Sequence, residues 1–340
     1  MRKIYIISII FLFAICCLNV KAQDIHFSQF LNSPLNLNPA QTGFFQGSQR
    51  FVLNHRNQWS SVTVPYSTFS GSFDLQALKR RFKQDIIGFG IVLNNDIAGD
   101  GNFGTTQGNF SVSYIKALNK RNNHIISFGL QIGAAQQKID FSKLYFNNQY
   151  DGDIFNPNLS NGEHFQKNSL FYPDINFGTH WFFQKDDQLI FNFGAALFHL
   201  NKPVVSFFEN NDVKLNRRFA AYSGVLIGLD KNIELTPSIL FMQQGKYNEM
   251  LYGAELNFIL NNSLYFYSAF SFGSFVRNND AIIAKASLSH RKFIFGISYD
   301  FNISELHPAS RYLGGYEFSI IYVVRNTYQK KAKEVPCPIF

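Results

Sequence analysis

Segments of about ten residues in which apolar side chains alternate with small or polar ones recur along this chain. The clearest is residues 293–304. Its odd-numbered positions hold Phe, Tyr or Ile, and its even-numbered positions from 296 onward hold Gly, Ser, Asp or Asn. The alternation returns in residues 126–133 and 175–181. Because successive side chains of a strand point to opposite faces, the pattern predicts a sheet with one apolar and one polar side.

The composition of the two sides favours a barrel in a membrane over a soluble sandwich. The apolar side is unusually aromatic, the polar side is rich in Gly, Ser and Asn, and a membrane barrel needs tilted strands of ~9–11 residues. We therefore expect an all-β fold, a single transmembrane antiparallel β-barrel of about 14 strands. The expected strands are residues 49–58, 66–75, 85–94, 106–118, 123–136, 172–184, 188–200, 217–229, 233–244, 249–260, 263–273, 281–290, 293–302 and 315–325.

The amino terminus predicts export. Arg2 and Lys3 precede an apolar stretch over residues 4–18, and small residues at Val20 and Ala22 flank a predicted cleavage before Gln23. Residues 1–22 are thus expected to be a cleavable signal peptide, with the outer membrane as destination. Cys16 and Cys17 follow large residues, which disfavours the alternative of a lipoprotein signal.

Composition excludes other classes of protein. The mean hydropathy is −0.09, with 17% aromatic and 16% charged residues, and no later apolar run is long enough for a spanning helix. Loss of the signal lowers the formal net charge from +8 to about +5, and the remaining Lys and Arg are scattered, so nucleic-acid binding is not expected. Cys337 would be the only remaining cysteine, which leaves no intrachain disulfide.

The two ends of the mature chain do not alternate. In residues 23–47, Phe27, Phe30, Leu31 and Leu35 have helical spacing, which predicts a short helix broken at Pro34, in a segment that packs on or in the barrel. The barrel is expected over residues 48–326. Residues 327–340 form a basic tail that ends in a Pro-Cys-Pro sequence. This tail is either a disordered periplasmic end or a partner contact through Cys337 and Phe340.

Short connections alternate with long ones along the expected strands. Barrels of this kind place short turns in the periplasm and longer loops outside, so residues 138–170, 201–216 and 304–313 are expected on the outside. The first of these is long enough to suggest a functional surface loop. No catalytic motif, metal-binding cluster or cofactor site is expected, because the histidines are dispersed. Asp96, Asp100, Asp151 and Asp153 could bind calcium, although turn capping explains them more simply.

Four short blocks carry a resemblance to a known family. They are residues 23–30 (QDIHFSQF), 34–40 (PLNLNPA), 54–59 (NHRNQW) and 199–203 (HLNKP). They resemble the PorP/SprF family, outer-membrane proteins of the type IX secretion system of Bacteroidetes. The positions that the resemblance marks as family-motif or structural residues are His26, Phe27, Ser28, Gln29, Asn38, Pro39, Ala40, Arg56, Asn57, Gln58, Trp59, His199, Asn201 and Pro203.

The resemblance implies a non-enzymatic role in secretion and surface attachment. The implied partners are the periplasmic ring and lipoprotein components of the system, outer-membrane lipid, and the C-terminal domain of a secreted cargo such as a gliding-motility adhesin. The barrel would dock exported C-terminal domains. The alternative is an outer-membrane transport channel for hydrophobic or small substrates, with residues 23–47 as an N-terminal plug.

Overall fold

The computed structural model describes residues 24–62, 64–77, 85–156, 158–160, 162, 167–208, 212–263, 266–305 and 307–324. The expected signal peptide and the tail over residues 327–340, with Cys337 and Phe340, lie outside the described residues. Within the described part of the chain, no helix is long and apolar enough to cross a membrane.

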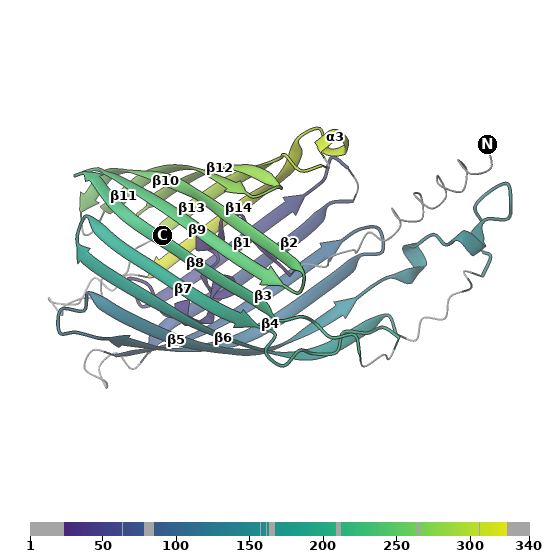
Figure 1. Cartoon of the computed structure of the whole chain (residues 1–340), viewed down its shortest axis with the longest axis horizontal. Coiled ribbons are helices and arrows are strands. Elements are labelled where there is room, and N and C mark those ends of the chain that lie inside the picture. The colour runs from purple at the N-terminus through teal and green to yellow at the C-terminus, as the bar shows by residue number, and fades with distance from the viewer. Residues whose placement is uncertain are drawn as a thin grey trace, which may run out of the picture.

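Fourteen antiparallel strands close into one barrel, in which each strand pairs with its neighbours in sequence and β1 pairs with β14 (Figure 1). The expectation of a closed transmembrane barrel of about 14 strands is confirmed. The strands are β1 Gln49–Gln58, β2 Tyr66–Ala77, β3 Ile86–Ala98, β4 Phe103–Ala117, β5 His124–Lys138, β6 Ser169–Asp186, β7 Leu189–Phe198, β8 Arg218–Asp230, β9 Ile233–Gln244, β10 Tyr247–Ser263, β11 Phe266–Arg277, β12 Ala281–His290, β13 Phe293–Asn302 and β14 Leu313–Val324.

Four strands, β1, β9, β12 and β13, have the bounds expected from the sequence. The expected strands 249–260 and 263–273 left Asn261 and Asn262 as a turn between them. This was wrong, because both residues remain in β10 and pair with Ser268 and Tyr267. The register shifts between Ile259 and Asn261, so a bulge absorbs the irregularity and the strand continues.

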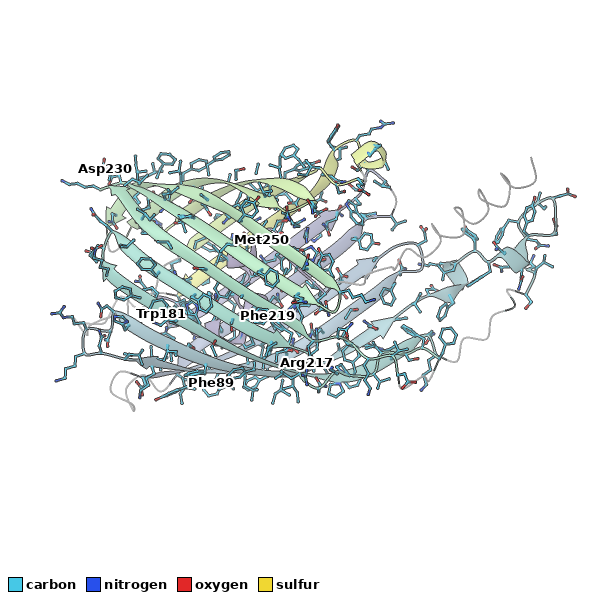
Figure 2. All side chains as sticks on the ribbon, in the orientation of Figure 1. Phe89, Trp181, Arg217, Phe219, Asp230 and Met250 are labelled. Carbon is cyan, nitrogen blue, oxygen red and sulfur yellow. The ribbon has the colours of Figure 1, made fainter. Side chains whose placement is uncertain are left out.

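The side chains divide between the two faces as the alternation predicted. In β13, Phe293, Phe295, Ile297 and Phe301 are exposed outside, whereas Ser298 and Asp300 are buried inside. Figure 2 shows Trp181, Phe219 and Met250 on the outer surface of the wall. An apolar outer face and a polar inner face are what a barrel needs to contact hydrocarbon outside while it encloses polar groups.

The two ends of the barrel differ in their connections. At one end β6, β8 and β12 join the next strand through tight turns at residues 187–188, 231–232 and 291–292. We call this the short-turn end. At the other, the long-loop end, residues 139–168 join β5 to β6 and residues 199–217 join β7 to β8. Figure 1 shows the β5–β6 connection projecting well beyond the rim, with the short helix α3 His307–Ser310 at the same end.

Residues 24–47, which we call the luminal segment, lie inside the barrel (Figure 1). The segment contains η1 Phe30–Asn32, α2 Pro34–Leu37 and η2 Pro39–Gln41. The expected single helix broken at Pro34 was wrong. Pro34 is instead the first residue of α2, where its missing N–H costs nothing. Phe27, Phe30 and Leu35 are buried as their spacing suggested, while Leu31 is only partly buried.

Candidate functional site

The luminal segment is held at the long-loop end by a cluster of buried charges, which we call the anchor cluster: Arg56, Glu249, Arg277, Asp300 and Glu317. Arg277 Nη2 donates to Asp300 Oδ2 at 3.0 Å, and Arg56 Nη2 donates to the same oxygen at 3.2 Å. Glu249 Oε1 lies 3.7 Å from Arg277 Nε. These charges lie on five strands, β1, β10, β11, β13 and β14, and the closed barrel brings them together because it joins β14 to β1.

Ser28 and Gln29 of the luminal segment complete this cluster. Ser28 Oγ donates to Asp300 Oδ2 at 2.7 Å and accepts from Arg277 Nη2 at 2.5 Å. The backbone N–H groups of Ser28 and Gln29 donate to the two carboxylate oxygens of Glu317, at 2.7 and 3.1 Å. Arg56 Nη1 donates to the His26 carbonyl at 2.6 Å. The segment thus supplies partners without which these buried wall charges would be less well satisfied.

Asp24 forms a second contact at the same end. His199 lies just after β7, and its Nε2 contacts Asp24 Oδ2 at 2.5 Å while its Nδ1 contacts Asp174 Oδ1 at 2.8 Å. A ring bonded to two carboxylates donates from both nitrogens, so it is an imidazolium. Burial alone would lower the pKa of His199, but the charge of Asp24 and the hydrogen bonds to both carboxylates raise it to about 9. Despite burial, His199 and Arg218 hold the pKa of Asp24 below its usual range.

This contact predicts a pH dependence of stability. A raised histidine pKa adds stability that is fully present below pH 6.5 and is lost as the pH rises through about 9. Urea unfolding of the purified barrel should therefore show a loss of about 3 kcal/mol over that range. A His199→Gln variant should lack this pH dependence. An equal alkaline loss in the variant would mean that another group causes it.

The middle of the luminal segment packs against glycines of the wall. A Cβ added to Gly129 would lie 2.3 Å from Ala40 N, and one added to Gly88 would lie 2.4 Å from Thr42 O. Ser127 Oγ donates to the Ala40 carbonyl at 2.7 Å, and Thr42 Oγ1 contacts Ser111 Oγ at 2.6 Å. The glycines therefore allow backbone to lie directly against backbone.

Asn38 joins the same contact from the other side. Its Oδ1 accepts from Ala40 N at 2.8 Å and caps η2, and its Nδ2 donates to the Thr179 carbonyl at 2.8 Å. A Cβ at Gly178 would lie 1.9 Å from Asn38 Oδ1. Pro39, in the first position of η2, is also buried. The Asn-Pro-Ala block is thus the part of the segment that approaches the wall most closely.

Near the short-turn end a buried ion pair fixes the last turn of the segment. Arg50 Nη2 donates to Asp74 Oδ2 at 2.7 Å, and Gly43 N donates to the same oxygen at 2.8 Å. Ser48 N donates to the Val324 carbonyl at 2.8 Å, where β1 and β14 meet. The luminal segment therefore runs the length of the lumen, from Asp24 at the long-loop end to Gly47, which precedes Ser48 at the short-turn end.

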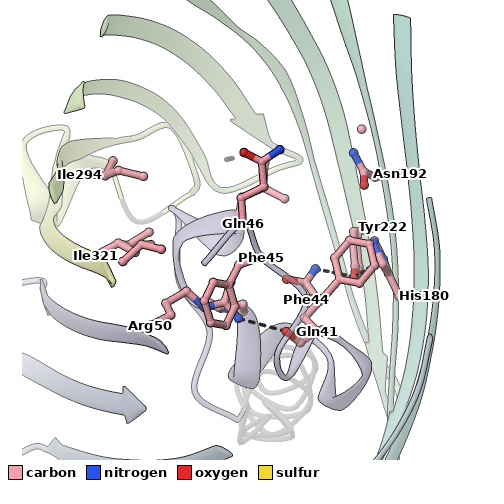
Figure 3. A pocket seen from close by; sticks show the side chains of 14 residues that line it. Gln41, Phe44, Phe45, Gln46, Arg50, His180, Asn192, Tyr222, Ile294 and Ile321 are labelled. Atoms are coloured by element: carbon pink, nitrogen blue, oxygen red, sulfur yellow. Dashed lines mark hydrogen bonds between the residues drawn. The ribbon is translucent and has the colours of Figure 1, made fainter. Parts of the chain in front are cut away.

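A cavity remains beside the segment, between Phe44, Phe45 and the wall (Figure 3). On one side His180 Nδ1 contacts the Tyr222 hydroxyl at 3.0 Å, and Gln41 Nε2 donates to that hydroxyl at 2.5 Å. Across the cavity lie Ile294 and Ile321. Among the described residues, no group of three or more His, Cys, Asp or Glu side chains is placed to hold a metal ion.

The structure brings most of the residues marked by the resemblance into these contacts. His26, Phe27, Ser28, Gln29, Asn38, Pro39 and Ala40 lie in the luminal segment, and Arg56 and His199 reach it from the wall. Asn201 Nδ2 donates to the Pro173 carbonyl at 2.7 Å, and the Pro203 carbonyl accepts from Leu215 N at 2.9 Å. These two residues shape the connection after β7 and make no such contact with the segment.

Asn57 and Gln58 end β1 and Trp59 follows it, next in sequence to Arg56 of the anchor cluster. Asn57 and Gln58 pair with Tyr316 and Gly315 of β14, and Trp59 adopts a positive φ of 56° where the strand ends. Its ring packs edge-on against Tyr66, at 5.3 Å between centroids. Trp59 therefore shapes the exit from β1.

The sequence interpretation did not identify Asp24 of the segment, nor four wall residues: Arg277, Asp300 and Glu317, which bond to the segment, and Asp174, which bonds to His199. One signal was present. Each of the four wall residues stands on the polar side of an alternating strand, otherwise occupied mainly by small residues such as Gly, Ser and Asn. Charges on that side in the absence of a wide pore indicate that something polar fills the lumen.

Solved structures of other outer-membrane proteins have a similar fold. The toluene transporter TbuX of Ralstonia pickettii has a similar fold, with 10% identity over 86% of this chain and 92% of that chain and a TM-score of 0.50. A FadL homologue of Pseudomonas aeruginosa matches with 9% identity over 84% and 92% of the two chains, at a TM-score of 0.47. At such identities the likeness concerns the fold alone. A search of curated proteins found no match.

The comparison with protein families is more specific. Residues 19–322 match the family described as type IX secretion system membrane protein PorP/SprF. The match covers the luminal segment and nearly the whole barrel, including all four blocks that carry the resemblance. This protein is an outer-membrane β-barrel that belongs to the PorP/SprF family of type IX secretion system membrane proteins.

Proposed function

We propose that this protein is a non-enzymatic component of the type IX secretion system that supports secretion and surface attachment of cargo by docking exported C-terminal domains. The family membership supports the secretion system as the setting. The observation that carries the docking role is the connection between β5 and β6, residues 139–168, whose described part is held by local contacts and exposes several large apolar side chains.

The β5–β6 connection is folded by its own short-range contacts. Asp151 Oδ1 accepts from Asp153 N and Ile154 N, at 3.0 and 2.9 Å, and Tyr150 pairs with Phe155 in an isolated bridge. Asp151 thus caps a turn, as its sequence context suggested. The connection nevertheless leaves Tyr145 79% and Ile154 66% exposed. Exposed apolar side chains on a structured loop are typical of protein interaction sites.

The orientation of the barrel supports the same role. Barrels of this class keep short turns in the periplasm and longer loops outside, so the long-loop end would face the exterior, where exported cargo arrives. The short-turn end would then face the periplasmic ring and lipoprotein components. The luminal segment enters from the outside end and is bonded to the wall along its length, which favours a platform over a passage.

Changing the exposed apolar side chains tests the docking role. A Tyr145→Ser, Ile154→Ser double variant should insert and fold normally, because neither side chain supports the barrel, yet should release cargo from the cell surface into the medium. The measurement is the ratio of surface-bound to released cargo on immunoblots. Leu118→Ser is the matched control, since Leu118 is 54% exposed at the short-turn end. Full retention in the double variant would reject the docking role of this connection.

A further inference from the structure

The cavity beside the luminal segment is lined mainly by apolar side chains, and the contacts of the segment do not explain this lining. It lies between the segment and the wall near the short-turn end, where Phe44, Phe45, Ile294, Ile321 and Val323 provide apolar walls (Figure 3). The exposed side chain of Gln46 lies at its edge. A cavity with mainly apolar walls is suited to an apolar occupant.

One polar group in the cavity wall lacks a partner. Asn192 of β7 is only 5% exposed, and its Nδ2 has no hydrogen-bond partner. Figure 3 places it on the side of Tyr222, across from Ile294 and Ile321. A buried amide donor left unpaired is unfavourable, so an occupant that supplies a carbonyl oxygen would be favoured. The cavity therefore selects an apolar group that carries a hydrogen-bond acceptor, such as an extended peptide with few N–H donors of its own.

The chain itself contains a segment of this chemistry close by. Val323 lines the cavity, and Val324, the last described residue, is bonded to Ser48 at the same end of the barrel. Beyond it, residues 325–334 are rich in charge, and residues 335–340 read Val-Pro-Cys-Pro-Ile-Phe. The last six residues carry no charged side chain, and their two prolines have carbonyls but no N–H, so their burial leaves fewer donors unsatisfied.

Reach and tethering favour this occupant over a free one. Residues 325–334 can span up to roughly 33 Å when extended, which is enough to turn back from the rim into the cavity. Belonging to the same chain also gives residues 335–340 an effective concentration at the cavity on the order of millimolar. The charged side chains of residues 325–334 can stay hydrated while the apolar side chains of residues 335–340 are removed from water.

We propose that residues 335–340 of this chain dock at the cavity between Phe44, Phe45 and the wall, whose volume of about 60 Å³ admits no more than one apolar side chain, with a backbone carbonyl accepting from Asn192 Nδ2. This inference is independent of the docking of cargo at the opposite end of the barrel.

Cys337 offers a direct test, because Cys16 and Cys17 are the only other cysteines and both precede the predicted cleavage. The full-length Gln46→Cys variant, purified from membranes, is oxidised with copper phenanthroline, and the disulfide between position 46 and Cys337 is quantified by mass spectrometry of non-reduced peptides. The control is Lys231→Cys, an exposed position in a turn at the same end of the barrel. We expect at least a tenfold higher yield of the intrachain bond at position 46.

A second variant separates docking from chance encounters of a tethered chain. Adding Ile339→Asp to Gln46→Cys puts a charge on the apolar end and should reduce the yield to that of the Lys231→Cys control. Equal yields at positions 46 and 231, or a yield unchanged by Ile339→Asp, would overturn the proposal. Disulfides formed between two copies, or none at position 46, would also overturn it, because the cavity would then take a second chain or another partner.

Discussion

Replacing Arg277 with alanine is expected to lower the free energy of unfolding by about 3–5 kcal/mol. Arg277 is 1% exposed and bonds to Asp300, to Asp280 at 2.8 Å and to Ser28 of the luminal segment. Its loss leaves Glu249 and Asp300 buried with fewer cationic partners, and an uncompensated buried charge costs far more than a surface one. Urea titration of the barrel in lipid vesicles, followed by tryptophan fluorescence, measures the change.

Two further variants sharpen the Arg277 experiment. Arg217→Ala removes an exposed arginine whose guanidinium donates to the Leu200 carbonyl, and it should change stability by about 0.5 kcal/mol or less. Arg277→Lys keeps the charge but loses the planar fork that serves several acceptors, so it should fall between the two. If Arg277→Ala and Arg217→Ala destabilised equally, the anchor cluster would not hold the fold together.

Replacing Gly129 with alanine is expected to displace the middle of the luminal segment. The added Cβ would lie 2.3 Å from Ala40 N and from Pro39 C, which are backbone atoms that cannot swing aside as a side chain can. Overpacking of this kind costs about 1–3 kcal/mol or more. Hydrogen exchange should rise for the amides of residues 38–43, because displacement exposes the hydrogen bonds within the segment and breaks the bond from Gly43 N to Asp74 of the wall.

Gly224→Ala is the matched control for Gly129→Ala. Gly224 also faces the lumen, but the nearest atom to its added Cβ is Ser238 Cβ at 3.6 Å, an ordinary contact. Both substitutions make the same change to the unfolded chain, so the difference between them reports the clash with the segment. Unchanged exchange of residues 38–43 in Gly129→Ala would show that the segment does not depend on this close approach.

The barrel could be predicted from the sequence because a strand's periodicity is local. Residues 293–302 reveal their two faces without knowledge of any other strand, and β13 has those bounds. The turn expected at Asn261 and Asn262 failed because asparagines also occur at bulges, and only the partner strand decides between the two. The alternation of side chains within a segment thus predicted that a strand exists more reliably than the residue at which it ends.

The contacts of the luminal segment could not be predicted in the same way. Asp24 meets His199 and Ser28 meets Glu317 only because the barrel closes and the segment threads it, and no local pattern encodes that distance along the chain. The resemblance marked Ser28, Asn38 and His199 but gave no partner for them. Those partners are identified only from the three-dimensional structure. The same holds for the wall glycines that leave room for Ala40 and Thr42, because their role depends on the position of the segment.

A disulfide that locks the luminal segment to the wall tests the account most directly. Thr42→Cys and Ser111→Cys replace hydroxyls 2.6 Å apart, a separation compatible with a disulfide, in a chain that also carries Cys337→Ser. Cells that produce the oxidised variant should secrete and retain cargo as well as wild type, because a docking platform needs no movement of the segment. Loss of secretion when oxidised, with recovery on reduction, would contradict the account and favour a channel whose plug must move.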